Sequence, residues 1–568
     1  MSETDNILEK YGYLPNVWGE GALFAFSGLD GETCSASWFV LTAHRSIGEF
    51  LIHTPVRYVF NLSCDGFMAC EVFTGDVFIA RYTGGNLTAV FASWHTLVGV
   101  LPAGGQACLS NENNDQIVAA TGICSDTGAA VALKTSGRQF ALAYGSSEQE
   151  ALDRAGKGLS FNILNLVVER LAIYNKLPAC GDHSLELLYR KCFSVMKVNS
   201  MKAEGSIRQS WSTPDRVPHR DMWLWDSVFH SLAMNLVDSD FGWDYLKSML
   251  DSQDQNGMIS HQVRANGWKS SITQPPILAW GVWENYQHTH NKERLAYALP
   301  RLSAYLQWDL DHRDKNQNGL LEWFIEENEN CRSGESGMDN SQRFDAALLL
   351  DAVDFSVFAA RDMQYLAWLY AEINEPVQAE KWLAKSKKLS STIHDTLWNP
   401  QEGFYYDRTM EGRFSDVKAV TGFLPLLLDD LPQERVTFLV NSLQDPNQFW
   451  SAFPIPSVSL ATPNWGTDMW RGAAWMNMNY LVWLGLNKHG QTETACRLRE
   501  QCLSLIEKYY REHGVIFEFY DTKDEISPTR CDRKGKQQEP YDIRQKMDSI
   551  RDYHWTAALC FLWLMDEK

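Results

Sequence analysis

Positive charge is scarce in this 568-residue chain. Its 51 lysines and arginines stand against 71 aspartates and glutamates, which gives a formal net charge of −20. No basic cluster is long enough to follow a phosphate backbone. A strongly acidic chain is repelled by nucleic acid and by anionic membrane surfaces, so we expect neither as a partner.

Long apolar runs and paired cysteines are also missing. No apolar run approaches the roughly 20 residues that a membrane-spanning helix needs. The first residues, Met1 to Lys10, are polar and acidic and lack the basic and apolar regions of a secretory signal. The 12 cysteines contain no CxxC pair, and several, such as Cys192 and Cys560, lie in apolar stretches. These absences predict reduced, packed thiols in a cytoplasmic protein.

Aromatic residues, in contrast, are abundant: 22 Trp, 21 Tyr and 27 Phe. Core packing would explain many of them. Others stand beside Asp, Gly or Asn in loop-like contexts, as in Trp223-Leu224-Trp225-Asp226 and Asn464-Trp465-Gly466. Sugar-binding clefts need such platforms, because an aromatic face covers the apolar face of a pyranose while nearby carboxylates and amides bind its hydroxyls. We therefore expect a small carbohydrate as the partner.

The hydrophobic pattern changes its period once along the chain. From about Gly21 to Tyr144, short apolar segments alternate with Gly, Asn, Asp and Ser turns, which predicts a β-sandwich. The predicted strands are 22–26, 37–41, 56–62, 67–73, 77–82, 87–91 and 139–144. We place this domain at residues 1–146 and a helical linker at 147–179.

After Pro178 the apolar residues recur with the helical period of 3.6. The predicted helices are 183–198, 222–237, 241–254, 275–289, 291–311, 343–373, 376–395, 416–430, 432–444, 468–487, 491–511 and 549–566. Longer polar loops after alternate helices fit an (α/α)6 barrel over residues 180–568, whose inner ring opens as a funnel at one end. A solenoid of helical hairpins is the alternative, but we find no repeat of fixed length. The predicted fold class is mainly α.

One carboxylate, Asp339, stands between Gly337 and the polar pair Asn340-Ser341, just before an apolar helical pattern that opens at Arg343. A loop at a helix N-terminus can aim a carboxyl group into a pocket. The alternative is a helix cap, with Asn340 or Ser341 as the capping residue and Asp339 favoured by the helix dipole.

Four further loops carry residues suited to sugar recognition. They are Pro218–Ser227, Ser271–Pro276, Asn464–Gly472 and Gly514–Asp521. An adjacent Trp and Asp offer a stacking face and an acceptor for two hydroxyls. Gln274 could reach a hydroxyl, or could only accompany a proline at a helix start. Glu518 is flanked by aromatic residues, which favours a carboxylate held in a cleft over a misplaced strand residue.

Together these motifs resemble glycoside hydrolase family 63. They are W-L-W-D-S-x-F, I-T-Q-P-P, E-S-G-M-D-N-S-x-R-F-D, W-R-G-x-x-W-x-N-x-N-Y, F-E-F-Y-D and the closing D-Y-H-W-T-A. The resemblance covers roughly Pro214 to Lys568 and extends more distantly to the trehalases of the same clan. It implies an (α/α)6 barrel, with Asp339 as general acid and Glu518 as general base. The implied sugar site contains Trp223, Trp225, Asp226, Gln274, Gly337, Arg343, Trp470, Arg471, Tyr520 and Trp555.

The implied reaction is hydrolysis of an α-glycosidic bond with inversion, in which one carboxylic acid protonates the leaving oxygen and one carboxylate activates water. This chemistry requires no cofactor. An α-glucoside is the expected substrate, with an α-mannoside as the alternative. Trehalase, a non-catalytic carbohydrate-binding protein and a helical-repeat scaffold are the other readings. After Glu518, the stretch from Thr522 to Gln545 is basic and polar, in place of the Gly-rich continuation that the family has there.

A separate loop has the look of a calcium site. Asp314, Asn316 and Asn318 place oxygen ligands at alternate positions before Gly319, and Glu322 could close the loop. The spacing is not that of an EF-hand. The alternative is an Asx-rich turn between two helices. A structural Ca²⁺ at these four residues is therefore a hypothesis.

Overall fold

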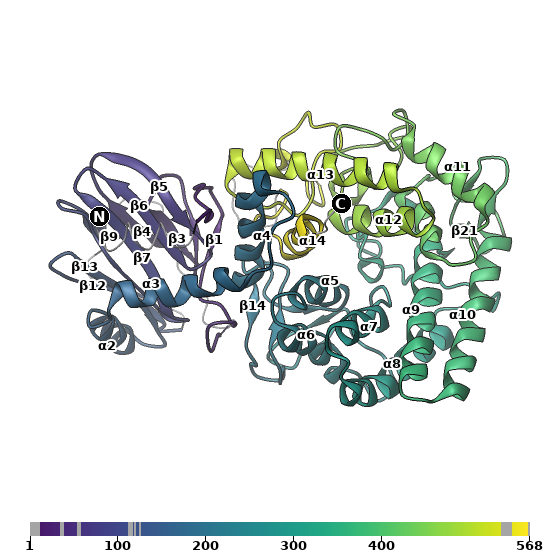
Figure 1. The fold of residues 1–568 in the computed structure, drawn as a ribbon, viewed down its shortest axis with the longest axis horizontal. Coiled ribbons are helices and arrows are strands. Elements are labelled where there is room, and N and C mark those ends of the chain that lie inside the picture. The colour runs from purple at the N-terminus through teal and green to yellow at the C-terminus, as the bar shows by residue number, and fades with distance from the viewer. Residues whose placement is uncertain are drawn as a thin grey trace.

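The computed structural model describes residues 12–34, 39–53, 58–111, 117–118, 121–123, 127–535 and 548–565. Its amino-terminal part holds two sheets, one of six strands in the order β1-β2-β3-β4-β9-β10 and one of seven in the order β11-β12-β13-β8-β7-β6-β5 (Figure 1). The strands are β1 (Leu23–Phe24), β2 (Val40–Ala43), β3 (Glu49–His53), β4 (Tyr58–Ser63), β5 (Phe67–Phe73), β6 (Val77–Tyr82), β7 (Gly85–Ser93), β8 (Thr96–Val100), β9 (Gln106–Asn111), β10 (Ile117–Val118), β11 (Thr121–Ile123), β12 (Ala130–Ser136) and β13 (Gln139–Gly145).

Large aromatic side chains hold the two sheets together. Phe50 of β3 contacts Phe78 of β6 with ring centroids 5.8 Å apart, and Phe60 of β4 contacts Phe140 of β13 at 5.6 Å. All four rings are fully buried. Burying such rings between two faces is the main source of stability for stacked sheets. We call strands β1 to β13 the two-sheet unit.

The predicted amino-terminal sheets are confirmed, although several strands were missed. Segments 67–73 and 77–82 coincide with β5 and β6. The predicted strands 37–41 and 56–62 begin in residues outside the described part of the chain. The sequence did not predict β3, β8, β9, β10, β11 or β12. The last of these reads AVALKTS, and its alanines have little intrinsic preference for strands.

Two helices lead out of the sheets. They are α2 (Glu148–Gly158), which packs on β12 and β13, and α3 (Ile163–Leu171). The Ser147 side chain accepts a hydrogen bond from the backbone N–H of Glu150 and so caps α2. In Figure 1, α3 runs along the two-sheet unit toward the helical part of the molecule.

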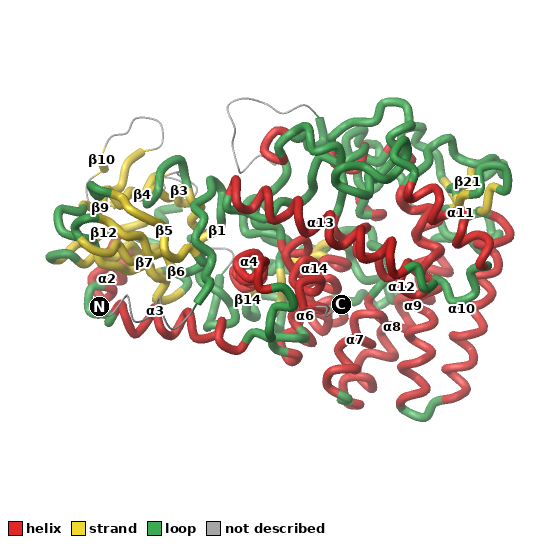
Figure 2. The backbone as a smooth tube through the Cα atoms, turned by 45° about the horizontal axis from the view of Figure 1, so that its top comes forward, coloured by secondary structure: helices red, strands yellow, loops and turns green. Residues whose placement is uncertain are grey.

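The rest of the described chain is mainly helical, as Figure 2 shows in red, and long loops and four short two-stranded sheets lie between the helices. The helices are α4 (Glu186–Val198), α5 (Leu224–Met234), α6 (Ser239–Asp251), α7 (Leu278–Thr289), α8 (Lys292–His312), α9 (Val353–Glu372), α10 (Pro376–Thr396), the 3₁₀ helix η6 (Val420–Leu427), α11 (Gln433–Gln444), α12 (Met476–Lys488), α13 (Thr492–His513) and α14 (His554–Met565).

Six of these helical segments pack on one another in sequence: α5 on α7, α7 on α9, α9 on η6, η6 on α12, α12 on α14, and α14 on α5 again. Every residue of α5 is buried, including the polar residues Asp226, Ser227, His230 and Ser231. In contrast, α13 buries one stripe and leaves its charged face in solvent. We call the six segments of this cycle the inner helices.

The predicted helix 343–373 starts too early. Gln342–Phe344 is a single 3₁₀ turn, and α9 begins only at Val353. Between them Ala347 has a φ of 52°, a left-handed conformation that ends a helix. No α-helix begins near Asp339, but Ser341 caps the short 3₁₀ helix Gln342–Phe344, because its side chain accepts a hydrogen bond from the backbone N–H of Arg343. Similarly, the predicted helix 468–487 begins at Met476.

Asp552 ties the two-sheet unit to the helices. Its carboxylate accepts hydrogen bonds from the backbone N–H of Leu23 in β1 at 2.9 Å and of Ile516 at 3.2 Å. It also pairs with Lys191 of α4 at 2.9 Å. Asp552 comes shortly before α14, so this contact fixes a segment that matters for the site below. Within the described residues, no helix has the length and apolar character needed to cross a bilayer.

Candidate active site

The loops that precede several inner helices form one pocket. From the predicted set, this pocket is lined by Trp223, Trp225, Asp226, Gln274, Gly337, Asp339, Trp470, Glu518 and Trp555. These residues come from the starts of α5 and α14, from loops before α7, α9 and α12, and from the extended segment after α13. Segments that lie far apart in the sequence therefore meet where the motif analysis predicted.

Tryptophan side chains build the walls of the pocket. Trp470 and Trp475 are stacked with ring centroids 3.8 Å apart. Trp225 meets Trp555 edge to face at 5.4 Å. Four nearly buried indoles held against each other have little rotamer freedom, so they present fixed apolar faces to a ligand.

Gly337 packs directly against the ring of Trp225, where no side chain would fit. Its φ is 71°, and a Cβ atom there would lie 2.3 Å from Cζ2 of Trp225. Any side chain would be strained by the backbone and would collide with the indole. The glycine of the Asp339 loop thus lets that loop approach Trp225.

Polar side chains line the pocket at the start of α5, and we call Gln274 and Asp226 the sugar-binding floor. Gln274 accepts a hydrogen bond from the backbone N–H of Trp225 at 3.2 Å and so caps α5, which has no cap of its own. Asp226 follows and is 3% exposed. Burial raises the pKa of Asp226 well above its usual value, and the charges of Glu518 and Asp339 add to this.

Among the described residues, two buried polar atoms of the pocket have no hydrogen-bond partner: Oδ1 of Asp226 and Nε1 of Trp555. Buried polar atoms are rarely left unpaired, because the lost hydration is costly. One acceptor or acid and one donor that face an aromatic pocket match the alternating hydroxyls of a sugar.

Glu518 is anchored in the core. It is 2% exposed, its backbone N–H donates to the carbonyl of Ile550 at 2.8 Å, and its carboxylate receives two hydrogen bonds from Arg533. Nε of Arg533 lies 2.9 Å from Oε2, and Nη2 lies 3.0 Å from Oε1. This fork-to-fork geometry fixes the plane of the carboxylate.

Asp339 lies on the more open side, with its side chain 23% exposed. Nζ of Lys534 is 2.5 Å from its Oδ2. Burial by itself raises the pKa of Asp339, but the charge and hydrogen bond of Lys534 outweigh it and leave the pKa below its usual value. In this state Asp339 is ionised at neutral pH.

Three of the predicted sugar-binding residues lie outside this pocket. Arg343 is buried behind it, where its guanidinium pairs with Asp354 at 2.7 Å and with Asp407 at 2.6 Å. Its remaining N–H groups point to the same carboxylates and to Met338, so none is left for a sugar hydroxyl. Arg343 therefore supports the Asp339 loop from inside.

Arg471 forms a two-pronged ion pair with the half-exposed Asp345 and donates to the carbonyl of Asn340. Tyr520 is fully buried, its ring is stacked on Phe453, and its hydroxyl accepts a hydrogen bond from the N–H of Phe517. Both residues hold the loops that carry Asp339 and Glu518. Their side chains do not reach the pocket.

The prediction missed six residues of the lining: Pro214, His219, Met469, Trp475, Arg533 and Tyr553. Most of them lie inside or next to the motifs quoted for the resemblance, so a wider reading of each motif would have included them. Arg533 is different, because it comes from the basic stretch that departs from the family pattern. Only the fold shows that this stretch returns to the carboxylates.

The predicted calcium loop is an Asx-rich turn whose oxygens bind backbone N–H groups. Asp314 accepts from Asn318 and Gly319, and Glu322 accepts from Lys315. No group of three or more metal-ligating side chains stands out among the described residues. One oxygen of Glu322 is nevertheless buried without a partner, and burial raises the pKa of Glu322 to about 7, with Asp351 adding to the effect. Calcium at Asp314, Asn316, Asn318 and Glu322 stays a prediction.

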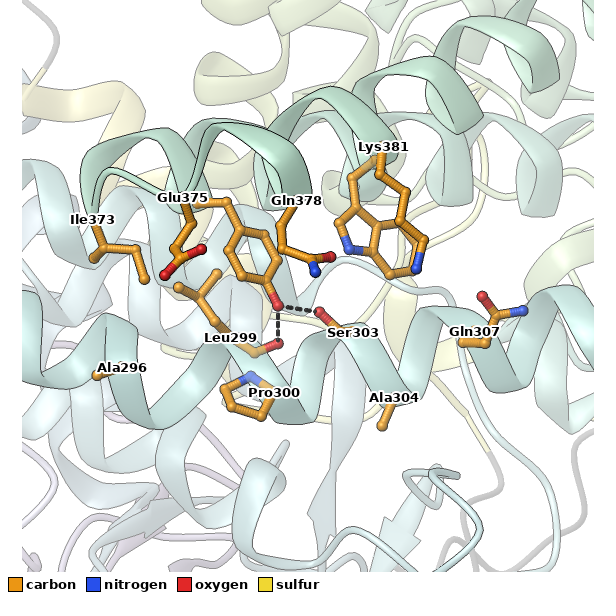
Figure 3. Close-up of a pocket in the computed structure, with 12 residues that line it drawn as sticks. Ala296, Leu299, Pro300, Ser303, Ala304, Gln307, Ile373, Glu375, Gln378 and Lys381 are labelled. Atoms are coloured by element: carbon orange, nitrogen blue, oxygen red, sulfur yellow. Dashed lines mark hydrogen bonds between the residues drawn. The ribbon is translucent and has the colours of Figure 1, made fainter.

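A larger hollow lies between α8 and the α9–α10 pair (Figure 3). Its lining contains a single carboxylate, Glu375, and the Tyr370 hydroxyl there donates to the Leu299 carbonyl and pairs with Ser303. It holds none of the motif residues and no carboxylate pair. The pocket around Asp339 and Glu518 is therefore the candidate active site.

The chain is similar in sequence and in structure to known glycoside hydrolases. The model of the mannosylglycerate hydrolase MGH1-like glycoside hydrolase domain matches residues 218–556. A mannosylglycerate hydrolase of Thermus thermophilus is 25% identical over 458 residues, which are 66% of this chain and 99% of the relative. The crystal structure of a family 63 mannosylglycerate hydrolase from the same species, in complex with glucose, has a TM-score of 0.54, with 25% identity and the same coverage of both chains.

A bacterial glucoamylase complexed with acarbose resembles the whole fold. Its TM-score is 0.61 at 12% identity, and the match covers 98% of this chain and 96% of the glucoamylase. This likeness concerns the fold alone, and it includes the two-sheet unit. Because the family model spans more than half of the sequence, the chain belongs to the MGH1-like glycoside hydrolases of glycoside hydrolase family 63.

Proposed function

We propose that the chain hydrolyses the α-glycosidic bond of a small glucoside or glucosyl conjugate with inversion, using Asp339 as general acid and Glu518 as general base. One observation carries this proposal. Both carboxylates line a single tryptophan-walled pocket that also holds the unpartnered buried atoms of Asp226 and Trp555. A pocket of this kind can hold a sugar ring between the acid and the base.

The steps follow from the two carboxyl groups. Glu518 takes a proton from a water molecule, and the oxygen of that water attacks the anomeric carbon. The bond between this carbon and the glycosidic oxygen breaks, and protonated Asp339 gives its proton to the leaving oxygen. Attack from the face opposite the leaving group inverts the anomeric configuration in a single displacement.

Trp223, Trp225, Asp226, Gln274, Gly337, Trp470 and Trp555 would bind the sugar that is cleaved from the substrate. Indole faces would cover the apolar face of the ring. Asp226 and Trp555 would pair with hydroxyls and so lose the cost of an unpartnered buried atom. Arg343, Arg471 and Tyr520 would act from behind the pocket, by holding the two loops in place.

A mannosyl group is the second candidate for the cleaved sugar. The relative from Thermus thermophilus is named a mannosylglycerate hydrolase, which favours mannose, whereas the related crystal structure is a complex with glucose. Glucose and mannose differ only in the configuration of the 2-hydroxyl, so the two sugars can be compared directly as ligands of the same pocket.

We also propose that the helices form an (α/α)6 barrel over residues 180–568, beside a β-sandwich domain at 1–146 and a helical linker at 147–179. The support is the cycle of inner contacts, in which α14 packs on both α12 and α5. The helices α4, α6, α8, α10, α11 and α13 would then form the outer ring. The active site would lie at the mouth of the barrel where the inner helices begin.

The test is a panel of α-glucosyl and α-mannosyl glycerates, α-linked disaccharides and α,α-trehalose, assayed for released monosaccharide. We expect release from one of the first two groups. Proton NMR during early turnover should show the inverted anomer first. Preferential cleavage of trehalose would favour the trehalase reading, and early appearance of the retained anomer would overturn the mechanism.

A further inference from the structure

Two neighbouring cationic side chains, Arg533 and Lys534, each form an ion pair with one of the two candidate catalytic carboxylates. Arg533 makes its two-pronged contact with Glu518, and the next residue, Lys534, binds Asp339 at 2.5 Å. A single dipeptide therefore bridges the acid and the base. These residues belong to the basic stretch that the sequence places where the family pattern has glycines.

The backbone of this dipeptide is held in place by a third carboxylate. The N–H groups of Lys534 and Gly535 donate to Asp468 at 2.7 and 2.8 Å. Asp468 also accepts a hydrogen bond from the side chain of Asn340 at 2.9 Å. Because Asn340 follows Asp339 in the chain, Asp468 is joined to the loop that carries the acid.

The held conformation is strained. Lys534 has a φ of 55°, in the left-handed region that residues other than glycine rarely adopt. Such strain persists only where surrounding contacts impose it, and it is concentrated at switches and ligand clamps. Here the imposing contacts are the two backbone hydrogen bonds and the two ion pairs. Breaking them would release the strain, which makes the held state reversible.

This arrangement conflicts with proton donation. A general acid must carry a proton when the glycosidic bond breaks. While Lys534 binds Asp339, the proton is on the ammonium group and the carboxylate is ionised. Arg533 likewise engages both oxygens of Glu518, one of which must approach the attacking water.

We propose that Arg533-Lys534 is an internal clamp that closes the active site in the absence of substrate, and that Lys534 must release Asp339 before catalysis. This proposal rests on the proposed function, since it assigns a regulation to that same site. A sugar that enters the pocket competes with the clamp. The apparent affinity for sugar is then reduced by the fraction of molecules in which the clamp is closed.

The decisive variant is Lys534→Met, which removes the charge and keeps the length of the side chain. We expect kcat/KM on the substrate found with the glycoside panel to rise at least about threefold. The dissociation constant of D-glucose or D-mannose, measured by calorimetry, should fall by a similar factor. Lys534→Arg retains the cation and should stay within about twofold of the native protein.

Two further variants complete the design. Lys508→Met removes a surface lysine that pairs with Asp524 on the outer face of α13, and it should change neither quantity. Gly535→Ala disfavours the clamped backbone without a collision, because Gly535 has a φ of 118° and no atom lies within 4 Å of the added Cβ. It should act in the same direction as Lys534→Met, and it decides the question if that variant fails to fold.

Unchanged or lower values of both quantities in Lys534→Met would overturn the clamp, since Lys534 would then be irrelevant or required. Failure of the proposed function looks different: no α-glycoside would be cleaved by the native protein or by any variant. In that case the clamp proposal is tested by the dissociation constants of the monosaccharides alone. Equal dissociation constants in native protein and Lys534→Met, or no binding in either, would overturn it as well.

Discussion

The acid side and the base side of the pocket are built in different ways. Glu518 lies in a buried extended segment, and backbone hydrogen bonds join it to Ile550. Asp339 lies in a partly exposed loop that is shaped by a glycine and by short 3₁₀ turns. The base is thus part of the core, whereas the acid is carried by a loop that other residues must hold.

The partners of the two carboxylates differ in the same sense. Arg533 is 9% exposed and grips Glu518 with a rigid guanidinium fork. Lys534 reaches Asp339 with one flexible, more exposed ammonium group. A planar fork gives a directional contact, and an ammonium group acts as a point charge that moves easily. We therefore expect the acid side to be the side that changes between resting and working states.

The largest expected effect comes from removing each carboxylate in turn. Asp339→Asn deletes the proton donor and Glu518→Gln the base, and each change is nearly isosteric. General acid and general base catalysis each contribute roughly 10²–10⁴-fold, so kcat/KM should fall by about that factor in both variants. An activated aryl glycoside needs little protonation and should partly restore Asp339→Asn but not Glu518→Gln. Equal rescue of both variants, or full activity in either, would contradict the assignment.

A smaller loss is expected at the sugar-binding floor, which both sides share. Asp226→Ala leaves the hydroxyls bound by Asp226 without a partner in a buried site. We expect a loss of about 2–3 kcal/mol in transition-state stabilisation, or about 30- to 150-fold in kcat/KM. The control is Asp395→Ala, which removes an exposed carboxylate near the end of α10 and should change kcat/KM much less. Near-normal kinetics in Asp226→Ala would mean that the sugar binds elsewhere.

The sequence predicted these two sides to different extents. Glu518 and its aromatic neighbours lie in an extended, apolar segment, and local pattern describes such a segment well. The loop of Asp339 was predicted to lead directly into a helix at Arg343, because the apolar residues after Arg343 match the helical period. The left-handed Ala347 interrupts that period, and nothing in the local pattern predicts its conformation.

Long-range pairs were harder to predict. Arg343 looks like a site residue from its motif, but it is saturated by Asp354 and Asp407, and Asp407 is distant in sequence. The contact of Lys534 with Asp339 likewise joins residues nearly 200 positions apart. A charge in a polar stretch has no period that reveals its partner. The motifs therefore predicted most residues that line the pocket. The fold was needed to show that Arg343 supports the Asp339 loop and that Lys534 pairs with Asp339.

The calcium hypothesis also concerns the acid side of the pocket. The loop with Asp314 and Glu322 is next to Arg313, which pairs with Glu335 of the Asp339 loop at 2.7 Å. If Ca²⁺ binds there, a concentration 100 times its dissociation constant stabilises the fold by about 2.7 kcal/mol. The melting temperature of chelator-treated protein should then rise on adding Ca²⁺ and stay constant in Glu322→Gln. No rise in the native protein would leave the Asx-rich turn as the full account of this loop.

The pH dependence of kcat/KM should show the smallest effect, and it tests the acid side alone. Lys534, Arg533 and His261 face Asp339 and lower its pKa against the effect of burial. The pKa of His261 is itself lowered to about 4 by burial, so His261 is uncharged near neutral pH. The carboxylates of Glu326 and Asp226 and the thiol of Cys331 are the other titratable groups whose charges couple to Asp339.

The sign of the pH effect follows from the role of the acid. Asp339 works only when protonated, so kcat/KM falls as pH rises through its pKa, and a lowered pKa moves this fall to lower pH. Removing the charge in Lys534→Met raises the pKa of Asp339 and should shift the alkaline limb to higher pH. Lys534→Arg keeps the charge and should leave the limb in place. The profile is measured on an unactivated α-glycoside, because an activated one bypasses the acid. An alkaline limb that stays fixed in Lys534→Met would show that Asp339 is not the proton donor or that Lys534 does not contact it in the free enzyme.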